Sequence, residues 1–396
     1  FDCQVYALEA YDWRRLPNER LVLFVVSTTG DGDPPDNMVA FWKFLRNRHL
    51  PTTALSSVLF SVFGMGDSSY ALYNAIARKL HVRMRQLGAK EFHPLGLGDD
   101  QSPKGVEADA DTWGADMWAS LLRRFPAPPG FVIDDTPAWC PAQDIKYDVR
   151  VVPAATETAG ETPVGSASDI CQFYAPPADA YNANGSVPLK ASVAANERLT
   201  STEWTQNVRH LELQLDATNP CIQYVAGDVA VVYPENMFDV DAFLKEFIGG
   251  DFCGEDAVQV VAKKAGDLPP FPSPCSLRDL FVKYVGVLGM PKRYALEQLS
   301  HFAQDEEQQE KLLELSSSAG ADLYHTYIRR EKRNFIEVLR DFPSCRPPLD
   351  VLLSVIPFIR PREFSIASSG IACGGKELHL CVAVVEYLTF YRNPRR

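Results

Sequence analysis

Strand-like and helix-like segments alternate over about the first 125 residues. Apolar strand candidates cover residues 3–10, 20–28, 56–64 and 91–98, and amphipathic helix candidates cover 37–48, 73–87 and 111–123. Strands that are apolar almost throughout are typical of parallel sheets buried on both faces, and a helix after each strand supplies the crossover that parallel pairing needs. The pattern therefore predicts an α/β doubly wound parallel sheet, in which ligands bind beyond the carboxyl ends of the strands.

The pattern changes after a region rich in Pro, Ala, Gly, Ser and Thr. That composition predicts a flexible linker at 126–188, interrupted by a short strand at 146–152. Strands with alternating apolar residues then predict an antiparallel β-barrel, interrupted by a helical insertion. The expected organisation is a sheet domain at 1–125, the linker at 126–188, and a barrel domain at 189–396 with its helical insertion at about 236–340.

Composition restricts the classes of function. A net charge of −12 argues against a nucleic-acid-binding protein. The nine cysteines are scattered without C-x-x-C spacing, and the seven histidines show no ligand spacing, so we expect reduced thiols and no metal site. No apolar run approaches the roughly 18 residues of a membrane span. Because the chain starts at Phe1 and ends at Arg396 without any stop signal, we expect both ends to be cut.

Glycine-rich polar loops follow three of the predicted strands. The first loop begins at Ser27, the second runs from Gly64 to Asn74, and the third contains Asp99 and Asp100. Glycines permit positive φ and leave backbone N–H groups open to a ligand. A single Gly-Asp turn into a helix is common and is often only structural. Three such loops at successive strand ends favour a site for a flat, electron-rich ring.

A second candidate site lies near the end of the chain. The stretch from Arg362 to Ser365 combines a guanidinium, an aromatic ring and a hydroxyl within four residues. An ordinary amphipathic strand explains such a motif when it stands alone. A planar, permanent cation is nevertheless well suited to a pyrophosphate group.

The first domain resembles the flavodoxin-like FMN domain of diflavin reductases. By this resemblance its strand order leaves the first strand of the sheet, and the phosphate loop after it, ahead of Phe1. Thr29 stands where cytochrome P450 reductases carry a tyrosine. This leaves Tyr70 as the main aromatic side chain that would stack on the flavin ring. The residues that the resemblance assigns to FMN are Ser27, Thr28, Thr29, Gly30, Met65, Gly66, Asp67, Ser68, Ser69, Tyr70, Ala71, Leu72, Tyr73, Asn74 and Asp100.

The second half resembles the ferredoxin-reductase-type FAD domain of the same family. The motif Arg362-Glu363-Phe364-Ser365 corresponds to Arg-x-Tyr-Ser, with Phe364 in place of the tyrosine. The resemblance places Arg362 on the pyrophosphate, Phe364 on the flavin ring, and Ser365 beside N5 as the catalytic hydroxyl. It adds Lys332, Arg333, Cys381, Val382, Ala383 and Tyr387 as FAD contacts, although Cys381 to Ala383 also suit an ordinary core strand.

The resemblance implies a diflavin oxidoreductase that passes electrons from NADPH through FAD and FMN. The NADPH site is expected beyond Arg396. Within the family, Thr29 and Phe364 fit the branch that serves cytosolic iron–sulphur cluster assembly, which implies a cytoplasmic location and an iron–sulphur acceptor protein of the anamorsin type. Two alternatives remain, namely a cytochrome P450 reductase-like donor to haem proteins and a non-catalytic flavodoxin-like and barrel scaffold.

Overall fold

The computed structural model describes residues 3–102, 105–128, 130, 145–153, 189–216, 222–249, 252–263, 269–389 and 394–395. The chain divides into two compact units, Phe1–Thr136 and Pro137–Arg396. Most of the predicted linker at 126–188 lies outside the described residues. The short strand expected within it is present as β5 (Tyr147–Val152), which belongs to the second unit.

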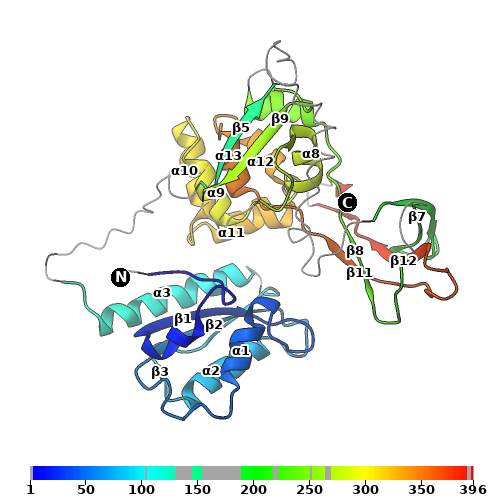
Figure 1. Ribbon diagram of the computed structural model, residues 1–396. Helices are drawn as coiled ribbons and strands as arrows, with labels where there is room; N and C mark the ends of the chain where they lie inside the picture. The colour runs from blue at the N-terminus through cyan, green and yellow to red at the C-terminus, as the bar shows by residue number, and fades with distance from the viewer. Residues whose placement is uncertain are drawn as a thin grey trace, which may run out of the picture. The chain divides into compact units, whose positions relative to one another are not determined.

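A parallel sheet forms the centre of the first unit (Figure 1). Its strands are β1 (Leu21–Ser27), β2 (Leu59–Gly66), β3 (Lys90–Glu91) and β4 (Gly96–Asp99). Strand β2 pairs in parallel with β1 on one side, and with β3 and β4 on the other. This confirms the predicted parallel sheet.

Strand β1 forms one edge of this sheet. The strand predicted at residues 3–10 is wrong, because the described part of this segment is irregular and pairs with no neighbouring strand. An extended segment without a partner leaves its backbone groups unpaired and gains nothing from a ladder. Leu23 and Val25, on one face of β1, are accordingly 44% and 56% exposed.

Helices cover both faces of the sheet. The helical segments are η1 (Trp13–Asn18), η2 (Asp36–Met38), α1 (Val39–Leu45), α2 (Ala75–Gln86) and α3 (Val106–Arg124). Phe24 and Phe60 lie in one buried cluster with Phe41 of α1 and Leu80 of α2. On the opposite face α3 lies close to β4, since a Cβ added at Gly96 would come within 2.6 Å of Trp113.

The core of the second unit lies between a small sheet and a set of helices. Strand β9 (Ala257–Ala262) is the middle strand, with β5 on one side and β10 (Cys275–Ser276) on the other, both antiparallel. The helical segments are α7 (Val240–Phe243), η3 (Leu244–Ile248), α8 (Leu277–Asp279), η4 (Leu280–Tyr284), α9 (Arg293–Ser300), α10 (Glu306–Ser316), α11 (Ala321–Tyr324), η5 (His325–Arg330), α12 (Phe335–Asp341) and α13 (Leu349–Val355). The stretch predicted as helical therefore also contains β9 and β10.

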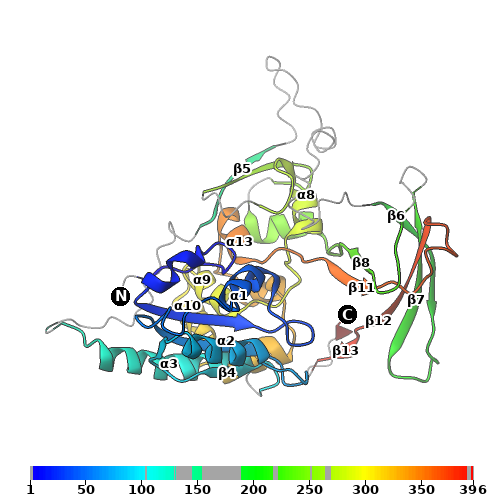
Figure 2. The same cartoon turned by 60° about the horizontal axis from the view of Figure 1, so that its bottom comes forward.

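The remaining strands form three further antiparallel pieces (Figure 2). One consists of β6 (Ala191–Arg198), β7 (Asn207–Leu215) and β12 (Glu377–Val384), with β7 in the middle. Another pairs β8 (Val229–Val232) with β11 (Arg362–Ser365), and the last pairs β13 (Tyr387–Leu388) with β14 (Pro394–Arg395). The predicted antiparallel strands are present, but the described ones form separate sheets without closing into a barrel.

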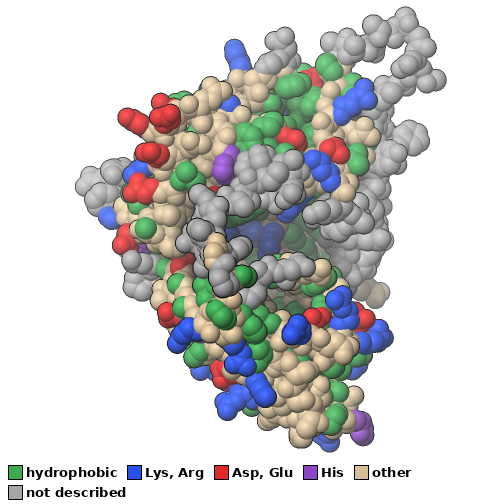
Figure 3. Space-filling model, turned by 90° about the vertical axis from the view of Figure 1, so that its left-hand side faces the viewer, with side chains coloured by type: hydrophobic (Ala, Val, Ile, Leu, Met, Phe, Trp, Pro, Cys, Tyr) green, Lys and Arg blue, Asp and Glu red, His purple; other side chains and the backbone are tan. Residues whose placement is uncertain are grey.

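Charged side chains of both signs lie on the surface, with hydrophobic ones between them (Figure 3). The acidic start of α10 is an example, because Asp305, Glu306 and Glu307 are all exposed, as expected of a solvated helix face. Among the described helices, none combines the length and the apolar character that a membrane span requires.

Candidate functional site

The three glycine-rich loops of the first unit meet at one edge of the sheet. In the parallel registers Ser27 is the partner of Met65, and Gly66 is the partner of Asp99. The strands β1, β2 and β4 thus end at the same level. This confirms that the loops after successive strands lie side by side, which is where a doubly wound sheet binds its ligands.

The first loop is a tight turn held by its own backbone. Thr29 and Asp33 exchange two backbone hydrogen bonds, with N···O distances of 3.0 and 2.9 Å. Gly30 lies within this turn at φ 47°, and a Cβ placed there would have only one atom, 4.0 Å away, as a neighbour. The hydroxyl of Thr28 accepts a hydrogen bond from the Ile76 N–H at 3.2 Å, which ties the loop to the start of α2. The loop therefore presents open backbone at Gly30.

Asn74 closes the second loop and is fully buried. Its Nδ2 donates to the Gly98 carbonyl at 2.9 Å and so joins the second loop to β4. Gly64 and Gly66 leave room for this amide, since an added Cβ would come within 2.5 and 2.8 Å of its side chain. Among the described residues nothing donates to Asn74 Oδ1. The structure thus places Asn74 as an internal clamp beneath the loops.

Replacing Asn74 with Ala should lower the free energy of unfolding of the first unit by about 2–4 kcal/mol. The Gly98 carbonyl would lose a buried partner, and φ of 54° strains an alanine. Asn74→Gly removes the same amide without the backbone strain, so its loss should be about 1 kcal/mol smaller. Urea denaturation followed by tryptophan fluorescence measures both. If Asn74→Ala were as stable as wild type, Asn74 would not be an internal clamp of the loops.

Two carboxylates hold the second and third loops together. Asp99 Oδ1 accepts from the Ser68 N–H at 2.8 Å, and Asp67 Oδ1 accepts from the Ser69 N–H and from Gln101 Nε2, both at 2.9 Å. Hydrogen bonds from Ser69 lower the pKa of Asp67, and those from Ser68 lower the pKa of Asp99. Since both values lie below 3.8, this stabilisation is present above that pH and is lost only in stronger acid. The loops keep their geometry throughout the neutral range.

The exposed part of this edge fits a flat aromatic ligand. Tyr70 is 67% exposed, and Met65 and Leu72 are also exposed, although each is large and apolar. Tyr73 is positioned differently, because its hydroxyl donates to the Leu97 carbonyl at 3.0 Å. The other predicted FMN residues lie on the same loops, and Asp100 is joined to Gly66 through a backbone hydrogen bond of 2.9 Å. Tyr70 and the open backbone of Gly30 therefore suit an isoalloxazine ring.

A pocket of about 550 Å³ adjoins the first loop at Gly32, Asp33 and Pro34. Its other walls come from α1 and α2, and Lys43, Arg46 and Lys79 line it. None of the residues predicted to contact FMN is among its lining residues. This pocket is therefore separate from the predicted ring site.

The Arg-x-Phe-Ser motif lies on β11, as predicted. Arg362 pairs in register with Val232 and Ser365 with Val229. Successive side chains of a strand alternate, so Arg362 and Phe364 share one face while Glu363 and Ser365 share the other. Arg362 is exposed, and within the described part of the chain it makes no ion pair, only a 3.3 Å hydrogen bond to the Arg360 carbonyl. Its guanidinium is thus available to an anion.

Strand β12 brings the second set of predicted FAD residues beside the end of β11. The link is a single bridge between Ile366 and Leu380, supported by a 2.9 Å hydrogen bond from Ala367 N to the His379 carbonyl. Cys381 and Ala383 share one face of β12, and both are exposed, while Val382 is half-buried on the other face. The described residues thus bring the β11 motif and the β12 residues into one neighbourhood.

A pocket of about 460 Å³ opens next to Ala383. Trp204, which is 62% exposed, lies on its wall with Thr205 and Gln206. Trp204 could not be predicted from the sequence, because an isolated tryptophan in a polar loop carries no recognisable motif. The exposed ring of Trp204 lies beside Ala383 of β12, and Arg362 of β11 has no ion-pair partner among the described residues. These groups suit a dinucleotide. The side chain of Tyr387 lies outside the described residues.

Lys332 and Arg333 come just before α12, in the helical part of the second unit. A capping box between Asn334 and Glu337 starts this helix. Arg333 Nη1 forms a 2.6 Å ion pair with Asp341, and its guanidinium lies 4.4 Å from the centre of the Tyr327 ring. Burial and a hydrogen bond to Asp341 raise the pKa of Tyr327 well above its usual range. Arg333 is therefore engaged within the helical part, and Lys332 is the exposed cation of the predicted pair.

Comparison with known proteins agrees with both halves of the chain. The family described as FAD binding domain matches residues 182–396, and the family described as Flavodoxin matches residues 1–113. Similar curated proteins named NADPH-dependent diflavin oxidoreductase 1 occur in Xenopus laevis (38% identical over 100% of this chain), Mus musculus (38% over 99%) and Arabidopsis thaliana (34% over 99%). The chain spans 63–64% of the length of these relatives.

These matches account for the order of the two units. FMN and FAD are the cofactors of these two kinds of domain. Most of the candidate residues lie on the strand-end loops of the first unit and on β11 and β12 of the second. With an FAD binding domain over more than half of its length and a flavodoxin domain before it, the chain belongs to the diflavin reductase family.

Proposed function

We propose that this chain is the flavin-binding part of an NADPH-dependent diflavin oxidoreductase. In the proposed reaction, electrons from NADPH pass through FAD and FMN to an acceptor protein. The observation that carries the proposal is 38% identity, over the whole chain, to a relative of that name. When bound, the two flavins supply the redox chemistry, and the protein supplies position and electrostatics.

The first unit would hold FMN at the edge where its three loops meet. The exposed ring of Tyr70 would pack against one face of the flavin, and backbone N–H groups around Gly30 would approach its polar edge. Thr29 offers no aromatic ring for the opposite face. We therefore propose that one face of FMN stays open, through which an acceptor protein could approach.

The second unit would hold FAD along β11 and β12. Arg362 would bind the pyrophosphate, because it is exposed and has no acidic partner among the described residues. Phe364 shares its strand face and would contact the ring system. Ser365 would place its hydroxyl beside N5, which requires the flavin to reach around the end of β11. We also propose that the separate antiparallel sheets belong to one barrel, with 236–340 as its helical insertion and 126–188 as the flexible link between the two flavin domains.

We propose an iron–sulphur protein of the anamorsin type as the acceptor, and the cytoplasm as the location. Thr29 and Phe364, where P450 reductases carry tyrosines, support this branch of the family. Cysteines without ligand spacing support a reducing compartment.

The test uses the full-length protein. Flavins released by denaturation and separated by HPLC should give one FAD and one FMN per chain, and anaerobic titration should show faster reduction by NADPH than by NADH. A [2Fe–2S] protein of the anamorsin type should then be reduced at least tenfold faster than cytochrome c at equal concentration. A folded protein without flavins would overturn the enzyme proposal. Flavins that are reduced but transfer electrons equally to both acceptors would overturn only the choice of acceptor.

A further inference from the structure

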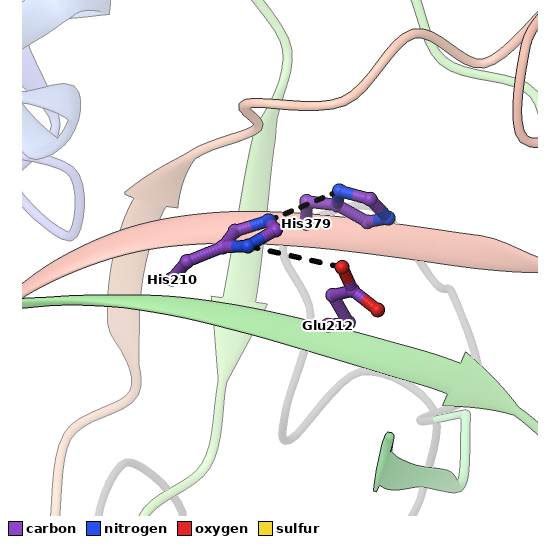
Figure 4. Close-up of side chains that lie close together, drawn as sticks. All are labelled: His210, Glu212 and His379. Atoms are coloured by element: carbon purple, nitrogen blue, oxygen red, sulfur yellow. Dashed lines mark hydrogen bonds and ion pairs between the residues drawn. The ribbon is translucent and has the colours of Figure 1, made fainter. Parts of the chain in front are cut away.

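Two imidazoles from neighbouring strands face each other in the second unit (Figure 4). His210 lies on β7 and His379 on β12, and the distance from His210 Nε2 to His379 Nδ1 is 3.1 Å. Glu212 Oε1 lies 3.8 Å from His210 Nδ1. Glu377 Oε1 lies within hydrogen-bonding distance of His379 Nε2. One nitrogen from each ring and an oxygen of Glu212 lie within 4.8 Å of one another.

The β7–β12 ladder sets this arrangement. His379 is directly opposite Glu212, and His210 is directly opposite Cys381, so these side chains share one face of the sheet. The side chains of His210, Glu212 and His379 are 27%, 32% and 23% exposed. The cluster is thus held by a paired sheet and is partly buried, while solvent still reaches it.

The contacts of the two rings restrict which ring nitrogens carry a lone pair. If His379 donates its Nε2–H to Glu377, its Nδ1 has a bare lone pair facing His210 Nε2. A neutral His210 that donates its Nε2–H to this lone pair has no proton on Nδ1. It then presents a second lone pair to the Glu212 carboxylate, which repels it. A cation bound by both lone pairs removes this conflict.

The charged side chains at the paired positions around the two rings are acidic. Glu197 of β6 is the register partner of His210, so a third carboxylate joins Glu212 and Glu377 around the two rings. Along this face the neighbouring β7 and β12 positions are Val208, Gln214, Cys381 and Ala383, none of which is cationic. The local field therefore favours a bound cation.

We propose that this cluster binds a divalent transition-metal ion of the zinc class. His210 Nε2, His379 Nδ1 and a Glu212 oxygen would be the protein ligands, with water completing the shell, since zinc commonly takes imidazole and carboxylate groups. Two nitrogens about 2.05 Å from one zinc ion lie roughly 3.1–3.4 Å apart, and the observed separation of the two ring nitrogens, 3.1 Å, falls in this range. Glu377 is a positioning residue that holds the His379 ring so that Nδ1 faces the ion.

A second group shares one of these ligands. Cys373, Glu377 and His379 also lie within 4.8 Å of one another. Cys373 belongs to the turn before β12, next to Gly374 and Gly375 at positive φ, whereas His210 is fixed within a strand ladder. Two imidazoles on paired strands form the more rigid site, so the proposal places the ion between His210 and His379.

The test is calorimetric titration of full-length, chelator-treated protein with ZnCl₂ at pH 7.5. We expect one zinc ion per chain, with affinity reduced at least tenfold in His210→Gln and in His379→Asn, and about tenfold in Glu377→Gln. Cys373→Ser should bind zinc like wild type. His81→Gln is the matched control, because His81 forms a 2.9 Å ion pair with Glu91 in the other unit and belongs to neither candidate metal group among the described residues. Circular dichroism and FAD content verify that each variant is folded.

Three outcomes would overturn the assignment. Wild-type protein that binds no zinc would mean that the cluster is not a metal site. Unchanged affinity in both His210→Gln and His379→Asn would place the bound ion elsewhere. Affinity lost in Cys373→Ser but retained in His210→Gln would assign the ion to the neighbouring cysteine group.

Discussion

Replacement of Arg362 with Ala should weaken FAD binding to the full-length protein by about 10- to 100-fold. A hydrogen-bonded contact to a charged group contributes roughly 1.5–3 kcal/mol, and each 1.4 kcal/mol is a factor of about ten. The substitution should leave the fold unchanged, because Arg362 is exposed and its one described hydrogen bond is the 3.3 Å contact to the Arg360 carbonyl. FAD affinity of the apoprotein, measured by flavin fluorescence quenching, gives the result.

Two variants separate the role of Arg362 from a general loss of charge. Arg362→Lys keeps the cation but loses the planar fork that binds a pyrophosphate through two contacts, so its affinity should fall between those of wild type and Arg362→Ala. Arg360→Ala removes a neighbouring exposed arginine and should change FAD affinity less than threefold. If both arginine-to-alanine variants bound FAD equally well, Arg362 would not be the pyrophosphate ligand.

Replacement of Tyr70 with Ala should weaken FMN binding by about 5- to 150-fold and leave FAD content unchanged. Stacking of a heteroaromatic ring on an aromatic side chain contributes about 1–3 kcal/mol by alanine substitution. Tyr70 is the exposed aromatic side chain of the second loop. Thr29 provides no aromatic ring for the opposite face of the flavin. Apoprotein titrated with FMN, together with HPLC quantification of both flavins, tests this.

Tyr70→Phe is the control for this second experiment. It retains the ring and loses only the hydroxyl, so FMN affinity should stay within about threefold of wild type. Because Tyr70 is 67% exposed, neither variant should alter the unfolding of the first unit appreciably. A Tyr70→Ala protein with wild-type FMN affinity would move the ring site away from the second loop.

Local patterns predicted much of the first unit. Glycines after apolar strands predicted loops at strand ends, and the registers Ser27 with Met65 and Gly66 with Asp99 bring those loops together. The prediction of a strand at residues 3–10 was wrong, because a strand forms only beside a pairing partner, and the sequence of this segment does not show whether one is present. Asn74 illustrates the same limit, since its type and position predicted a ligand contact, but only the structure shows that its amide is buried and donates to the Gly98 carbonyl.

In the second unit, segments distant in the sequence decide the details. Strand β9 lies within a stretch predicted as helical, and it forms because β5 and β10 pair with it from both sides. Arg333 matched a phosphate-binding cation by its position, but Asp341 and Tyr327 engage its guanidinium. These partners come together only through the packing of α12 against the preceding helices.

The sequence by itself determined the class of each half, the loops at the strand ends and the Arg-x-Phe-Ser motif, because strand–helix alternation, glycine positions and short motifs are local properties of the chain. Only the tertiary structure decided which of these groups are exposed and which are already engaged, as Arg362 and Arg333 show. It also decided the meeting of His210 with His379, which are 169 residues apart. Strand register brings such residues together, and register depends on long-range pairing that no local pattern specifies.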